Sequence, residues 1–321
     1  MALTLYNKGF SGWTQLGIFL SLWGVCIIFG SLLAAASWWL STGQGILNME
    51  HDMLRPQYAN AVKIVQAIST FFMFLLPAVL YAFICYKNGW LALGFSQKPV
   101  LAAIGICLLI LIAATPTIDA LSFFNRAIPL SPKTRAFFDN IEKNYEAQVK
   151  VIGEVKTFGQ YLFSLIMIGL LPALFEETLF RGGLQNMLAR WWRSPWAAIV
   201  VTSIVFSAIH GSWYGFFPRI ALGMVLGIIF HFTQNIWYNV TLHFINNALV
   251  VTIMYLETNQ KKPETSLDNF TFPWWTAVFS VAIMVFLFRL LQKKDGHPAP
   301  SEIVYDRYYP FGNNEIIAKN D

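Results

Sequence analysis

Eight apolar runs, separated by polar residues, constrain this chain more than any other feature of its sequence. A membrane-crossing helix needs about 20 mainly apolar residues, and most of the runs reach that length. Of the 321 residues, 56% are hydrophobic and only 12% are charged, which is unlike a soluble domain. The sequence therefore predicts an all-α, polytopic membrane protein with about eight transmembrane helices, at residues 15–40, 64–86, 99–123, 161–191, 196–217, 220–232, 237–256 and 272–291.

The charged residues indicate how the chain is oriented. The net charge of +5 includes no Lys/Arg-rich block, so we expect no nucleic-acid partner, and most basic residues lie near the ends of apolar runs. Eight spans place both termini on one side, and the positive-inside rule favours the cytoplasm of a bacterial inner membrane. We expect one integral membrane domain over residues 1–321, with a motif-bearing core at about 161–256 and a polar tail at 292–321. The long polar connection at 125–160 is expected to form a solvated helix on the opposite side.

Two adjacent glutamates and an arginine lie inside the fourth apolar run. Charge at membrane depth costs roughly 2.5–3.5 kcal/mol per residue, so such residues indicate a functional site or a structural ion pair. Glu177 and Arg181 are four residues apart on one helical face, where they can form a supporting ion pair. Glu176 is rotated by about 100° and has no counter-charge nearby in its helix. A buried carboxylate of this kind can act as a general base or acid, although both glutamates could instead only hold helices together.

Three further polar residues lie within later runs. His210 falls in the second half of the fifth run, while His243 and Asn247 share one face of the seventh because they are four residues apart. The neighbouring Asn246 points about 100° away and is expected to bond another helix. His210, His243 and Asn247 lie away from the ends of their runs, as does Glu176. We therefore expect these four residues to converge in one polar intramembrane cavity. A base, two imidazoles and an amide suit amide hydrolysis, in which one group activates water and donors stabilise the oxyanion.

Two other functions are compatible with the same residues. A zinc-dependent membrane peptidase could use Glu176, His210 and His243 as ligands, but the chain has no His-Glu-x-x-His motif and no spacing that dictates a metal geometry. The three cysteines lie in apolar segments without a CxxC pair, which supports neither a zinc knuckle nor a disulfide framework. We expect no cofactor, with zinc as the open alternative. Alternatively, a non-catalytic membrane immunity or transport-associated protein could use the same cavity for binding.

Three short motifs resemble those of a known family. Residues 176–181 resemble the motif Glu-Glu-x-x-x-Arg, residues 206–210 resemble Phe-x-x-x-His, and residues 243–247 resemble His-x-x-x-Asn. In this order, each on its own apolar run, they are similar to the signatures of the CAAX-protease and bacteriocin-processing family. That family contains intramembrane endopeptidases, including the Ras-converting type II CAAX proteases, and bacterial self-immunity and abortive-infection proteins. The resemblance covers about residues 161–251.

The resemblance implies an activity and a role for each motif residue. It implies that Glu176 and His210 activate the hydrolytic water, and that His243 and Asn247 form the oxyanion hole. Glu177 and Arg181 would be supporting residues. The implied enzyme is a membrane-embedded endopeptidase that works beside membrane lipid on a peptide or protein substrate, including a lipidated one, without a required metal.

Overall fold

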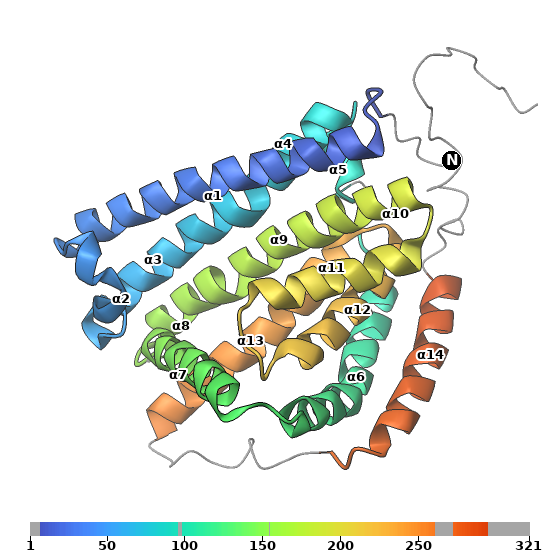
Figure 1. Cartoon of the computed structure of the whole chain (residues 1–321). Coiled ribbons are helices and arrows are strands. Elements are labelled where there is room, and N and C mark those ends of the chain that lie inside the picture. Colours follow the sequence, from blue (N-terminus) through green and yellow to red (C-terminus); the bar gives the residue numbers. More distant parts are fainter. Residues whose placement is uncertain (1–6, 96–97, 154, 261–271, 295–321) are drawn as a thin grey trace, which may run out of the picture.

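The structure is a computed structural model, and it describes residues 7–95, 98–153, 155–260 and 272–294. Within those ranges the chain is almost entirely helical, and its one β-bridge joins Asn7 to Tyr86. Figure 1 shows the α-helices. They are α1 (Gly12–Thr42), α2 (Met49–Asp52), α3 (Ala59–Thr70), α4 (Leu76–Cys85), α5 (Gly89–Ala92), α6 (Leu101–Ala127), α7 (Pro132–Gly153), α8 (Phe158–Ser164), α9 (Leu171–Glu177), α10 (Asn186–Trp192), α11 (Pro195–Ile209), α12 (Phe216–Thr233), α13 (Ile236–Gln260) and α14 (Thr276–Lys294).

Seven helical spans in the described ranges are long and apolar enough to cross a membrane. They are Gly12–Thr42, Pro56–Cys85, Leu101–Ala127, Phe158–Trp192, Phe216–Thr233, Ile236–Asn259 and Thr276–Lys294. The predicted all-α polytopic membrane protein is therefore confirmed. The predicted single domain stays a prediction, and of the predicted polar tail only residues 292–294 lie in the described ranges.

The remaining expected span, at residues 196–217, is shorter than predicted. Helix α11 ends at Ile209 after 15 residues. It stops there because Gly211 has a φ of +68°, a left-handed conformation that ends helices and suits glycine. The chain then turns before α12 begins. His210 is consequently the residue that caps α11. The expectation that it lies inside a continuous helix was wrong.

The motif-bearing span, Phe158–Trp192, is one long helix with two widened sections. Its first turn is fixed by a capping box, in which Thr157 and Gln160 bond each other's backbone N–H groups. π-Helical segments occupy Leu165–Leu170 and Thr178–Gln185. The first comes directly before the turn that contains Pro172, and the second begins directly after Glu177. Such segments are rare and frequently occur at functional sites.

Glycine carbonyls join the motif helix to α12. Arg181 Nη2 donates to the carbonyl of Gly223 at 3.2 Å, and Gln185 Nε2 donates to that of Gly227 at 2.9 Å. Donors and acceptors are each four residues apart, so they meet along aligned faces. A Cβ on Gly227 would lie 2.9 Å from Gln185 Oε1, so the end of the Gln185 side chain would have to shift. These contacts hold the buried Arg181 against α12.

Helix α7 is the expected helix of the long polar connection. Figure 1 shows it crossing the end of the bundle at which α8 begins and α13 ends. The opposite end carries the turn between α10 and α11 and the C-terminal end of α14. Much of α7 is exposed, as expected. Its side chains nevertheless also contribute to the interior, as described below.

Candidate active site

Glu176, His210 and His243 converge from three different spans. The Nε2 atoms of His210 and His243 each lie 3.9 Å from Oε2 of Glu176. The glutamate comes from α9, the first histidine follows α11, and the second lies on α13. Three groups that are far apart in the sequence therefore face one another inside the bundle.

Glu176 is buried with one oxygen lacking a partner. The residue is 8% exposed, and its Oε2 atom has no hydrogen-bond partner among the described residues. A separation of 3.9 Å from each imidazole is too long for a direct hydrogen bond. Polar groups at such distances can be bridged by a water molecule. The geometry thus leaves an acceptor aimed at a space between two imidazoles.

A backbone contact orients His210. Its Nδ1 atom lies 2.7 Å from the carbonyl oxygen of Phe206. A carbonyl can only accept a hydrogen bond, so Nδ1 carries the proton in this contact. In the neutral ring, Nε2 then has a free lone pair, and this is the atom that faces Glu176. His210 is thereby set up to accept a proton or a hydrogen bond on the side of the carboxylate.

Glu177 contacts both Arg181 and His243. Its Oε2 atom lies 3.2 Å from Nε of Arg181, an ion pair whose alignment is not that of a hydrogen bond. Its Oε1 atom lies 2.8 Å from Nδ1 of His243. The guanidinium also lies over the ring of Phe206, 4.9 Å from the ring centre, and such contacts favour a cation. The i, i+4 ion pair expected from spacing is present, and the histidine is an additional partner.

Two neighbouring asparagines lie beside His243 on α13. Asn246 Nδ2 donates to Oδ1 of Asn247 at 3.4 Å. This contact occupies the oxygen of Asn247 and leaves its NH₂ group for other partners. Both side chains line the same cavity as His243, so the expectation that Asn246 bonds another helix was wrong. The four predicted catalytic residues and Asn246 all line this cavity.

The cavity has a volume of about 590 Å³ and extends from the motif residues towards α7. Its lining includes Tyr145 and Gln148 of α7, and Met53, which lies between α2 and α3. Arg219 of α12 also lines it and forms no ion pair within the described ranges. These lining residues carry no recognisable motif, so they could not be predicted from the sequence.

Helix α7 is attached to the loop that follows His210. Ser212 Oγ donates to Glu142 at 2.7 Å, and the Tyr214 hydroxyl donates to Asp139. The ring of Phe138 also stacks on that of Trp213. The mixed charges along α7 indicated a solvated helix. The spacing of its residues in the sequence did not show that one face of this helix covers a cavity.

The donor atoms do not fit a tetrahedral zinc site as they stand. Ligand atoms about 2.1 Å from zinc lie about 3.4 Å apart, whereas Glu176 Oε2 is 3.9 Å from each Nε2. No group of three or more His, Cys, Asp or Glu side chains in the described ranges is arranged to hold a metal. We therefore assign no step of the chemistry to a metal.

Comparison with known proteins identifies the segment that contains these residues. Residues 158–249 match the family model described as type II CAAX prenyl endopeptidase Rce1-like. This segment resembles an Rce1-like domain. The resemblance inferred from the three motifs is thus confirmed, and the family is one of membrane proteases. All four residues that converge on the cavity from α9, α11 and α13 fall inside the Rce1-like domain, whereas α7 and α14 lie outside it.

A curated relative from a bacterium matches a similar length of chain. The uncharacterized protein YpbD of Bacillus subtilis (strain 168) is 33% identical over 89 residues, which are 26% of this chain and 42% of that protein. The chain thus matches less than half the length of this relative. No solved structure matches the chain.

Proposed function

We propose that this integral membrane protein is an intramembrane endopeptidase that hydrolyses a peptide bond with an activated water molecule. The observation that carries the proposal is the buried Oε2 of Glu176, which has no hydrogen-bond partner and lies 3.9 Å from two imidazole Nε2 atoms. A carboxylate facing such a space is suited to hold a water molecule and to take its proton.

Glu176 and His210 together orient and activate that water. The water donates one hydrogen bond to Glu176 Oε2 and the other to the free Nε2 of His210, which leaves an oxygen lone pair directed at the substrate. As the water oxygen attacks the carbonyl carbon, Glu176 takes one proton and the carbonyl π electrons move to its oxygen. When the tetrahedral intermediate collapses, the C–N bond breaks and Glu176 returns the proton to the leaving nitrogen. The products are a new carboxyl group and a new amine.

His243 and Asn247 stabilise the oxyanion. Because Nδ1 of His243 donates to Glu177, its Nε2 can donate as well only when the ring is an imidazolium. Two carboxylates, Glu176 and Glu177, then face two cations, Arg181 and His243, so the buried charges balance. The NH₂ group of Asn247 is the second donor. Preorganised donors of this kind contribute on the order of 10²–10³ in rate each.

The substrate reaches the catalytic residues from the end of the bundle that α7 crosses. The lining of the cavity by Tyr145, Gln148 and Met53 supports this route. In the orientation expected from the basic residues, this end faces away from the cytoplasm. Lateral entry from lipid is compatible with either orientation.

Cleavage by reconstituted protein tests the proposal. The purified full chain in liposomes is given quenched fluorescent peptides that differ only in the presence of a prenyl group. We expect cleavage by the wild type, a loss of 10²–10⁴ in rate for Glu176→Gln, and none for Glu257→Gln, an exposed glutamate on α13. Peptide that is bound but never cut by the wild type would favour the immunity or transport-associated alternative. Loss of cleavage on chelation, with stoichiometric zinc by elemental analysis, would favour the zinc peptidase.

A further inference from the structure

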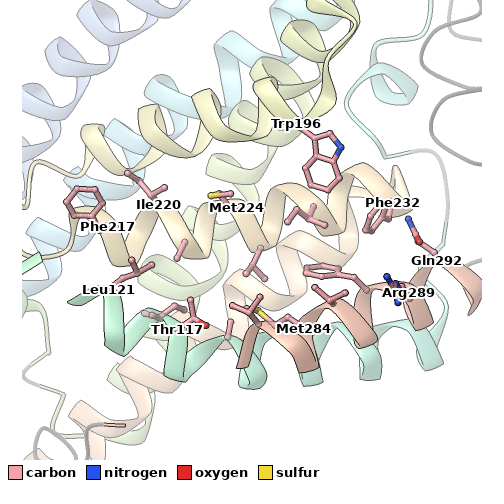
Figure 2. Close-up of a pocket in the computed structure, with 18 residues that line it drawn as sticks. Thr117, Leu121, Trp196, Phe217, Ile220, Met224, Phe232, Met284, Arg289 and Gln292 are labelled. Carbon is pink, nitrogen blue, oxygen red and sulfur yellow. The ribbon is translucent and has the colours of Figure 1, made fainter. Parts of the chain in front are cut away.

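A second, apolar groove lies between α6, α12 and α14. It has a volume of about 690 Å³, and its lining is almost wholly apolar. Figure 2 shows Ile220 and Met224 of α12 facing Thr117 and Leu121 of α6 and Met284 of α14. Along α12 the lining runs from Phe217 to Phe232, which is about 22 Å of helix. The groove is therefore longer than the roughly 15 Å depth of hydrocarbon in one leaflet.

The groove is separate from the candidate active site. Leu222 of α12 lines the catalytic cavity, whereas Ala221, Met224 and Val225 line the groove. The two spaces thus lie against different faces of α12. No motif residue of the Rce1-like domain lines the groove.

One end of the groove is polar. The stripe of α14 that lines it is apolar at Val281, Met284, Val285 and Phe288 and then continues with Arg289 and Gln292. Figure 2 shows Arg289, Gln292, Phe232 and Trp196 gathered towards one end, with Phe217 and Leu121 towards the other. Tryptophan and arginine commonly lie at the level of lipid headgroups. The polar end thus has the features of a membrane interface.

Arg289 has no anionic partner in the described part of the protein. It lies within the span Thr276–Lys294, and no ion pair to it is formed there. An ionisable side chain inside a span is expected to pair with an opposite charge. Lys293 and Lys294 follow in the last turn of α14, so the positive charge at this end is larger still.

We propose that the groove binds a single anionic phospholipid, with an acyl chain between α6, α12 and α14 and the phosphate at Arg289. The apolar lining excludes a polar ligand, and the unpaired guanidinium selects a negative headgroup. Basic pockets between transmembrane helices are known to hold anionic lipid headgroups. Gln292 donates a further hydrogen bond to the same headgroup. The site takes its ligand from the leaflet at the α10 and α14 end of the bundle.

Native mass spectrometry of the full-length protein tests this binding without any need for cleavage. The protein is exchanged into detergent with phosphatidylglycerol or phosphatidylcholine that have identical acyl chains. We expect wild-type protein to retain one phosphatidylglycerol in preference to phosphatidylcholine. A basic residue near a membrane surface contributes about 1 kcal/mol to anionic lipid binding, which is about fivefold in affinity. Arg289→Gln should therefore lower phosphatidylglycerol retention by about fivefold and leave phosphatidylcholine retention unchanged.

Two further variants make the test specific to the groove. Lys294→Gln removes a charge from the same helix end, but Lys294 does not line the groove, so this variant should lower phosphatidylglycerol retention less than Arg289→Gln does. Ala221→Phe fills the groove and should lower the retention of both lipids, while the melting temperature shows whether it folds. Equal losses in Arg289→Gln and Lys294→Gln, or no preference for phosphatidylglycerol in the wild type, would overturn the proposal. Displacement of the lipid by a prenylated peptide would assign the groove to substrate. Displacement by inorganic phosphate would assign the groove to a free anion. Either result would also overturn the proposal.

Discussion

Nδ1 of His243 lies 2.8 Å from Oε1 of Glu177, although the two residues are 66 positions apart in the sequence. The other oxygen of Glu177 faces Arg181 at 3.2 Å. One buried carboxylate thus neutralises a guanidinium and orients an imidazole. We therefore expect Glu177 to have two separable roles, one in stability and one in the orientation and charge of His243.

Removing the charge of Glu177 should affect both roles. Glu177→Gln leaves Arg181 buried without a counter-charge, and breaking a buried pair in this way costs about 3–5 kcal/mol. We expect a clear fall in the melting temperature in detergent, together with loss of cleavage. The double variant Glu177→Leu with Arg181→Met removes both charges and should recover most of the stability, but not the cleavage, because His243 still lacks its partner. Recovery of cleavage in the double variant would contradict the role assigned to the His243 contact.

Asn246 should affect catalysis through Asn247. Asn246→Ala removes the donor that occupies the oxygen of Asn247. We expect the kcat of this variant to fall about tenfold with KM unchanged. This loss is smaller than the 10²–10³ expected in Asn247→Ala, which loses an oxyanion donor. Asn246→Asp should be more harmful than Asn246→Ala, because a carboxylate can only accept and would take the NH₂ group of Asn247. Steady-state kinetics of the three variants check this order. If Asn246→Asp is as active as the wild type, Asn246 does not position Asn247.

A side chain at Gly227 should destabilise the protein. A Cβ there would lie 2.9 Å from Gln185 Oε1 and 3.0 Å from Cγ2 of Ile199, and overpacking of this kind costs typically about 1–3 kcal/mol. We expect Gly227→Ala to lower the free energy of unfolding in detergent by that amount. Gly17 of α1 is the matched control, because a Cβ there would meet nothing within 4 Å. Equal stability of the two variants would show that the contacts between the motif helix and α12 contribute little.

The orientation of the cavity can be measured directly. If both termini are cytoplasmic, Gln148 at the α7 end faces outward and Arg193, between α10 and α11, faces inward. In a cysteine-free background, Gln148→Cys should react with a membrane-impermeant maleimide in intact cells, and Arg193→Cys should react only after the cells are opened. The reverse pattern would place the cavity at the cytoplasmic face and would show that the positive-inside rule misleads here.

The spans and motif residues could be predicted because the signals for them are local. Hydropathy and i, i+4 spacing depend on neighbouring residues, so they located the fourth run and the pair of Glu177 and Arg181. The contact of Glu177 with His243 could not be predicted, since it depends on how two distant spans pack. The left-handed Gly211 that ends α11, and the π-helical segment that follows Glu177, likewise change positions that an ideal helix would predict.

The covering of the cavity by α7 could not be predicted for a different reason. Charged residues along the connection indicated exposure, which is correct for most of the helix. However, a few residues on one face, including Tyr145 and Gln148, contribute to the cavity. An amphipathic pattern indicates that one face is buried but does not identify what it covers.

We propose that Glu176 and His210 activate one shared water molecule. The single-turnover cleavage rates of Glu176→Gln, His210→Gln and the double variant show whether the two residues act as a unit. Residues that act as a unit are not additive. We predict that each single variant loses about 10²–10⁴ in rate and that the double variant is no slower than the slower single variant. Wild-type cleavage by Glu176→Gln, or losses that multiply fully in the double variant, would contradict the account.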